Sequence, residues 1–219
     1  MSRKAQSSRS VLTPRDAEIL VALGHQVSLL TRKQIQRAWW SASTTPTACG
    51  RRLDLLLDQG LLQTMWVPLA VDIRVVRNPL AEWRPGESRP DLSGVIAAVR
   101  ERATRPLWHS TTHEFVFVTT AAGAARVGGR TPRVRPSEAA HDITLAEVFL
   151  WYRRTAPDLA RHWRAPDGHK GLGERVSDAV IARPGRPIEI EVVGTSYSHT
   201  KLMLFHEFCK SRAREYQLW

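Results

Sequence analysis

The segment DAVIARPGRPIEIEVVGTS, residues 178–196, decides the architecture that we expect for the C-terminal half of this chain. Two runs rich in β-branched residues flank the turn sequence PGRP, residues 184–187, and this pattern predicts a β-hairpin. Side chains alternate along a strand, so Glu189 and Glu191 share one face, which Asp178 could approach from the preceding strand. Adjacent carboxylates repel one another unless a cation lies among them or water reaches them. A divalent metal, a nearby Lys or Arg, or exposure to solvent would each meet this requirement.

The composition favours a globular, basic protein that binds a polyanion. The 219 residues are 42% hydrophobic, which is enough to bury the core of one large domain or two small ones. The 32 Lys and Arg residues exceed the 21 Asp and Glu residues and give a net charge of +11. We therefore expect duplex DNA as a partner, although a GC-rich genome that encodes arginine at most cationic positions would give the same bias.

Other classes of protein lack support in the sequence. Cys49 and Cys209 are far apart and have no metal-ligand spacing, so neither a disulfide framework nor a zinc site is expected. No stretch approaches the roughly 20 apolar residues that cross a bilayer, and the basic N-terminus leads into no signal-peptide core. The sequence predicts a cytoplasmic protein without a membrane partner.

Residues 12–77 follow a basic, disordered tail (residues 1–11) and have the order of a winged helix-turn-helix. Helix N-caps are predicted at Thr13, Thr31 and Thr45. Strands are predicted at residues 61–67 and 72–77, the second completing the wing. The phrase RRLDLLLDQGLL, residues 51–62, resembles the third helix and wing entry of winged-helix DNA-binding domains.

This resemblance implies a set of DNA-binding residues. The third helix of such domains enters the major groove and reads it near the N-terminal end of the helix. The corresponding positions here are Thr45, Thr47, Arg51 and Arg52, and the second helix would place Arg32, Lys33 and Arg37 near the phosphate backbone. Winged helices also bind proteins, so a solvated basic face remains the alternative.

The rest of the chain is predicted to form a second domain. Residues 78–92 are rich in Pro and Gly and are expected to be a linker to a domain at 93–219. A strand is predicted at 113–120 and a last helix from His199 to Tyr216, with Arg214 on its basic side. The pair His141-Asp142 precedes a helix and is interpreted mainly as its N-terminal cap.

The C-terminal hairpin resembles the PD-(D/E)xK nuclease fold, in which a carboxylate, a hairpin and an E-x-E or E-x-K motif precede a helix. The resemblance implies that Asp178, Glu189 and Glu191 bind Mg²⁺ and catalyse phosphodiester cleavage, which requires hard oxygen ligands beside the phosphate. Two positions depart from the family pattern, because Ser177 replaces its Pro and Glu191 replaces its Lys. Lys201, on the following helix, is a candidate for the missing ammonium group.

The order of parts also resembles the replication-relaxation family of plasmid and mobile-element proteins. The resembling pieces are residues 12–76, HDITLAEV at 141–148, SDAVI at 177–181, and IEIE with KLMLFHEF downstream. The implied fold class is α/β (α+β overall), with an N-terminal winged helix-turn-helix followed by a restriction-endonuclease-like domain.

Three functions follow as hypotheses. The first is a plasmid or mobile-element protein that binds duplex DNA through the winged helix and uses its nuclease-like C-terminal domain as a second DNA or partner surface. The second is a Mg²⁺-dependent endonuclease, and the third is a protein-interaction scaffold. Candidate protein partners are a second copy of the chain or a replication, transfer or transposition protein.

Overall fold

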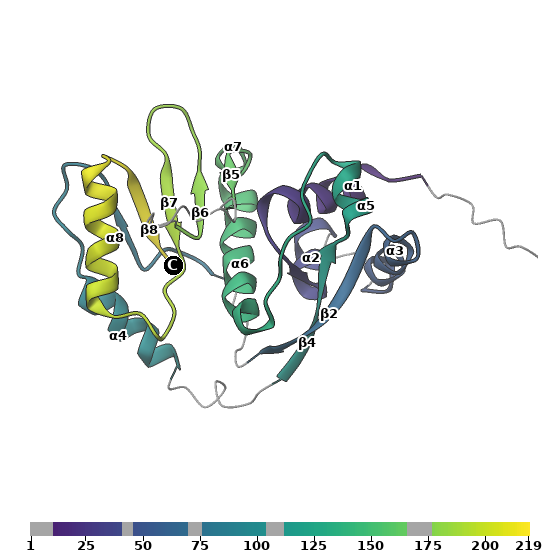
Figure 1. Ribbon diagram of the computed structural model, residues 1–219, viewed down its shortest axis with the longest axis horizontal. Coiled ribbons are helices and arrows are strands. Elements are labelled where there is room, and N and C mark those ends of the chain that lie inside the picture. Colours follow the sequence, from purple (N-terminus) through teal and green to yellow (C-terminus); the bar gives the residue numbers. More distant parts are fainter. Residues whose placement is uncertain (1–10, 41–45, 70–75, 104–111, 166–176) are drawn as a thin grey trace, which may run out of the picture.

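The chain forms an α+β structure in which two sheets pack on different sides of one long helix, α6 (Ala139–Thr155) (Figure 1). The computed structural model describes residues 11–40, 46–69, 76–103, 112–165 and 177–219. The mixture of helices and strands expected from the sequence is confirmed.

Local capping signals begin the first helices. Thr13 forms a capping box with Asp16 at the start of α1 (Pro14–Val21), and Thr31 forms one with Gln34 at the start of α2 (Arg32–Trp39). A π-helical turn, η1 (Ala22–Gln26), extends α1. Helix α3 (Pro46–Asp58) is followed by a turn at Gly60, whose φ of 66° is a backbone conformation that glycine adopts without strain.

The N-terminal sheet has the strand order β1-β4-β2. Its strands are β1 (Leu30–Thr31), β2 (Leu62–Leu69) and β4 (Thr112–Thr119), and both pairings are antiparallel. Strand β4 therefore lies between the other two and pairs with β2 along its whole length, with Trp66 opposite Phe115.

This pairing differs from the predicted order of segments. The wing strand expected at 72–77 lies mostly outside the described residues, and the described partner of β2 is β4, which the sequence had assigned to the second domain. The difference has a physical reason, since hydrophobic alternation identifies a strand but not its partner. The N-terminal sheet thus contains a strand, β4, from beyond the predicted domain boundary at residue 93.

The second sheet has the order β3-β8-β7-β6-β5. Its strands are β3 (Ala81–Trp83), β5 (Trp163–Arg164), β6 (Ala179–Ile181), β7 (Ile188–Glu191) and β8 (Glu215–Leu218). The hairpin predicted at 178–191 is confirmed as β6–β7, with Val180 opposite Glu189 and a positive φ at Gly185. Strands β7 and β8 are parallel and are joined through helix α8 (His199–Ser211).

Two segments of this sheet were not expected. Residues 78–92, predicted to be a linker, contain β3, which pairs with β8 at the edge of the sheet. The last helix ends at Ser211 rather than near Tyr216, because Ala213 adopts a positive φ of 50° and breaks the helical run. Residues 215–218 then form β8, with Tyr216 and Leu218 buried on one face.

Helices cover both faces of the second sheet. Helices α4 (Leu92–Ala103) and α8 pack on the face that carries Tyr216 and Leu218. Helix α6 covers the other face, where Ile188 and Ile190 join a core that continues into α1, α2 and α3. In Figure 1, α8, the second sheet, α6 and the N-terminal helices follow one another along the long axis of the molecule. Short helices α5 (Ala121–Arg126) and α7 (Pro157–Ala160) and the 3-10 turn η3 (Pro136–Glu138) complete the described elements.

Candidate nucleic-acid interface and carboxylate cluster

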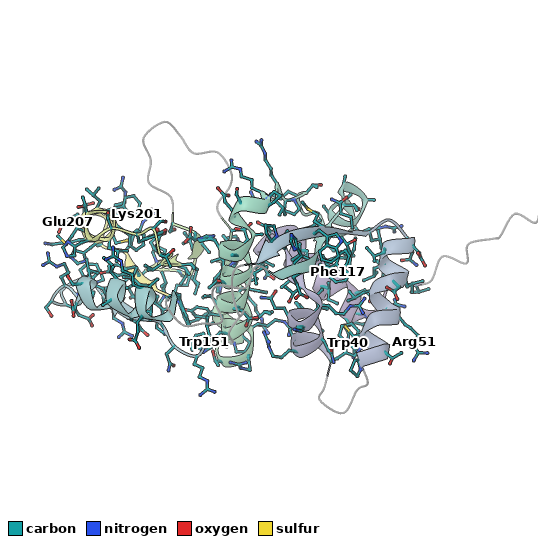
Figure 2. All side chains as sticks on the ribbon, turned by 90° about the horizontal axis from the view of Figure 1, so that it is seen from below. Trp40, Arg51, Phe117, Trp151, Lys201 and Glu207 are labelled. Atoms are coloured by element: carbon teal, nitrogen blue, oxygen red, sulfur yellow. The ribbon has the colours of Figure 1, made fainter. Side chains whose placement is uncertain are left out.

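Part of the predicted DNA-binding surface is exposed on α2 and α3. Lys33, Thr47 and Arg51 are exposed, and Arg51 extends outward from α3 in Figure 2. Arg32 is also exposed, with Asp54 at 4.0 Å, a loose contact that leaves the guanidinium in solvent. Thr45 lies outside the described residues. Three of the predicted cations on these helices thus face solvent together with Thr47.

Arg52 has a different environment from its neighbour Arg51. Its Nε donates to Asp16 Oδ1 at 2.8 Å and its Nη2 also donates to Asp16. The Asp16 side chain is fully buried and accepts a further bond from Thr13 Oγ1 at 2.7 Å. Burial by itself raises the pKa of Asp16, but the hydrogen bonds from Arg52 and Thr13 outweigh it and leave that pKa below 3.8. Arg52 therefore joins α3 to the start of α1.

Arg37 likewise pairs with a buried carboxylate. Its Nη2 donates to Glu147, a residue of α6 whose side chain is 2% exposed. Removing Arg37 would leave the buried carboxylate of Glu147 without its counter-charge, so this pair holds α2 against α6. Arg37 and Arg52 are thus engaged in the scaffold, although the sequence pattern had grouped them with the DNA-binding residues.

The hairpin carboxylates lie in the interior of the second sheet. Glu189 is 1% exposed and accepts hydrogen bonds from Arg214 Nη1 at 2.6 Å and from the Ser177 hydroxyl. Glu191 is also buried, and its Oε1 accepts a bond from the Tyr197 hydroxyl at 2.7 Å. The requirement for a cation beside these carboxylates is therefore met at Glu189 by Arg214.

Asp178 joins the hairpin to α6. Its Oδ2 accepts the backbone N–H of Val192 at 2.8 Å and lies 3.0 Å from His141 Nε2. The other ring nitrogen of His141 lies 3.5 Å from Asp142 Oδ1. Burial lowers the pKa of His141, whereas its hydrogen bonds to Asp142 and Asp178 raise it, and the balance places that pKa at about 10.

This arrangement corrects the interpretation of His141-Asp142 as a helix cap. Helix α6 begins at Ala139, so both residues lie inside its first turn, and Glu138 occupies the N-cap position without a side-chain capping bond. Asp142 still lies near the positive end of the helix, but His141 contacts Asp178, the residue before β6.

Lys201 is linked to the carboxylate cluster indirectly, through its contact with the ring of Tyr197. Its Nζ lies 3.2 Å from the centroid of Tyr197, whose hydroxyl donates to Glu191. The backbone N–H of Lys201 donates to Ser198 Oγ, the N-cap of α8. The contact with the tyrosine ring is a cation–π interaction.

The residues present fit a magnesium ion poorly. Within the described ranges, no three His, Cys, Asp or Glu side chains are grouped so that they could hold a metal ion. Oxygens of Asp178, Glu189 and Glu191 instead accept bonds from protein donors. The donors are Arg214 and the Ser177 hydroxyl at Glu189, the Tyr197 hydroxyl at Glu191, and the backbone N–H of Val192 at Asp178.

Sequence reasoning missed the donors of this cluster. Ser177 and Tyr197 are close to the carboxylates in sequence, but no local signal marks them as their partners. Arg214 reaches Glu189 only because β8 lies parallel to β7, which puts Tyr216 beside Glu189. A prediction of the β7–α8–β8 crossover would have brought Arg214 to this place.

The described part of the chain contains no helix with both the length and the apolar character needed to cross a bilayer. No protein-family model, curated protein or solved structure matches the chain.

Proposed function

We propose that this protein binds duplex DNA through α2 and α3, which together with α1 and the paired strands β2 and β4 make up a winged helix-turn-helix. The observation that carries the proposal is the order α1-β1-α2-α3-β2, with β4 pairing with β2 from beyond β3 and α4. Lys33, Thr47 and Arg51 are exposed on the second and third of these helices. Exposed arginine and lysine suit contacts with phosphates and guanine. The net charge of +11 supports a polyanionic partner.

The second sheet fits a nuclease-like fold that does not cleave DNA. The β6–β7 hairpin followed by α8 and a parallel β8 is compatible with the resemblance to PD-(D/E)xK nucleases. Internal donors to the hairpin carboxylates argue against a functioning metal site. The proposal therefore assigns DNA binding to the N-terminal elements and a structural or partner-binding role to the second sheet, in a plasmid or mobile-element setting.

The test is the salt dependence of duplex binding. Arg51→Ala and Lys33→Ala should weaken binding to a labelled random-sequence duplex, alone and more strongly together. Each lost phosphate contact should reduce the slope of log K against log salt by about 0.9. Arg100→Ala, which removes an exposed arginine from α4, is the matched control and should leave the isotherms unchanged.

Other outcomes separate the alternatives. Unchanged slopes for both variants would reject the assignment to these helices, and absence of affinity for any DNA at low salt would favour a protein-interaction scaffold. The endonuclease alternative is measured by incubating supercoiled plasmid with the protein and Mg²⁺ or Mn²⁺. Nicking that Asp178→Ala abolishes would establish that activity, and we expect none.

A further inference from the structure

An aromatic cluster is exposed on the N-terminal sheet. Trp66 on β2 and Phe115 on β4 are 58% and 45% exposed, and their ring centroids are 3.8 Å apart. His113 extends the cluster, with its ring 6.0 Å from that of Trp66. Large aromatic side chains are usually withdrawn from water, so an exposed group of them marks a binding surface.

The sheet geometry explains why these rings are exposed. Trp66 and Phe115 are directly opposite in the antiparallel ladder, so they project from the same face. The reverse face carries Val67 and Val116, which pack with Ile143 of α6. On the face of the rings, the N-terminal helices bury Phe117 but do not extend over Trp66 and Phe115.

Basic residues at the start of α2 lie beside this aromatic cluster. Thr31 pairs with Val116, so α2 starts next to the position of Phe115, and its first two residues are the exposed Arg32 and Lys33. Arg32 also lies close to α3. Its Nη1 would be 3.5 Å from the Cβ of any larger residue at position 50, which is a glycine. Glu114, between His113 and Phe115, belongs to the opposite face by strand alternation. The cluster thus adjoins the surface proposed to bind phosphates.

We propose that Trp66 and Phe115 form a platform on which unpaired bases stack, so that the protein prefers DNA with opened base pairs over a continuous duplex. Every base has a π-face, and stacking on an aromatic side chain accepts any base sequence. Arg32 and Lys33 hold the backbone of the same strand. The idea deepens the proposed function, since it rests on the same N-terminal surface binding DNA.

The experiment compares three labelled probes: a duplex, the same duplex with a central mismatched bubble, and one strand alone. The wild type should bind the bubble and the single strand more tightly than the duplex. Trp66→Ala and Phe115→Ala should each weaken binding to those two probes by about 5- to 100-fold while changing duplex binding little. Trp66→Phe retains an aromatic ring and should keep most of the wild-type affinity for the bubble and the single strand.

Controls make the result specific. Leu204→Ala removes another exposed apolar side chain, 59% exposed on α8, and should change no affinity. Thermal melts should be similar for all variants, and Trp66→Phe keeps the test valid if an alanine variant unfolds. Equal losses on all three probes, or no loss on any, would overturn the platform.

Two further outcomes separate this idea from its premise. If Trp66→Ala with Phe115→Ala changes self-association but not DNA binding, the cluster is an interface between copies of the chain and the platform is rejected. If Arg51→Ala leaves duplex binding intact while the ring variants lose bubble binding, the proposed reading by α3 fails but the platform stands. If Arg51→Ala weakens duplex binding while the ring variants keep their bubble binding, the platform is rejected and the proposed function stands.

Discussion

Adjacent residues on α3 have opposite environments. Arg51 faces solvent, whereas Arg52 reaches back to the buried carboxylate of Asp16. Successive side chains on a helix differ in direction by about 100°, so one member of an Arg-Arg pair can face a partner while the other faces a ligand. The charge pattern alone gives both the same role, and only the position of α1 separates them.

Arg52→Ala should lower the free energy of unfolding by about 3–5 kcal/mol, because it leaves Asp16 buried without its counter-charge. Arg51→Ala is the matched control and should change that free energy by less than about 0.5 kcal/mol, as expected at an exposed position. Urea denaturation of both variants measures the difference. Equal stability of the two variants would contradict the scaffold role of Arg52.

At the scale of elements, α6 organises the protein. Its residues are buried along most of its length and contact both sheets, as expected for a helix in the centre of a fold. Polar contacts join α6 to α2 on one side and to the second sheet on the other. Gln34 Nε2 of α2 donates to the carbonyl of Ile143 at 3.0 Å, and Tyr152 donates to Gln217 of β8 at 2.5 Å. His141 adds the contact with Asp178 at its N-terminal end.

The His141 contact should make stability depend on pH. Its pKa is raised from 6.5 to about 10 in the folded protein, so the protonated ring stabilises the fold fully below pH 6.5. That contribution should be lost as the pH rises from 6.5 to about 10, where the folded protein also releases the proton. We therefore expect the difference in unfolding free energy between the wild type and His141→Gln to shrink over this range.

Denaturant unfolding of both proteins at several pH values measures that difference. Asp178→Asn removes the carboxylate nearest the ring and should reproduce the effect of His141→Gln in direction. A difference that stays constant from pH 6.5 to about 10 would show that His141 is not held protonated by these carboxylates.

At the scale of the molecule, one core joins the two sheets. The same cluster of buried side chains includes Leu53 of α3, Phe149 of α6 and Ile190 of β7. Arg51 and Lys201 nevertheless lie at opposite ends of the molecule (Figure 2), so the basic face of α3 is far from the carboxylate cluster. The shared core should make the protein unfold as one unit.

Phe149→Ala should lower the unfolding free energy by about 3–5 kcal/mol, the usual cost of removing a buried phenyl ring. Because Phe149 lies in the shared core, hydrogen-exchange protection should fall in both β2–β4 and β7–β8. Leu204→Ala, at an exposed position, should leave protection unchanged. Loss of protection in one sheet alone would contradict the common core.

Features that depend only on neighbours along the chain are encoded locally. The caps at Thr13 and Thr31, the end of α3 near Gly60 and the turn at Gly185 follow from side chains that bond their own backbone and from glycine conformations. The β6–β7 hairpin and the common face of Glu189 and Glu191 follow in the same way from strand alternation.

Which distant segments meet depends on how the whole chain packs. That packing placed β4 beside β2, added β3 to the second sheet, and ended α8 early enough to form β8. Through the last of these it brought Arg214 to Glu189, one of the carboxylates that the resemblance assigns to a metal. Such pairings cannot be read from a short segment, because the local sequence of a strand, or the identity of a charged side chain, does not specify the partner that it will contact.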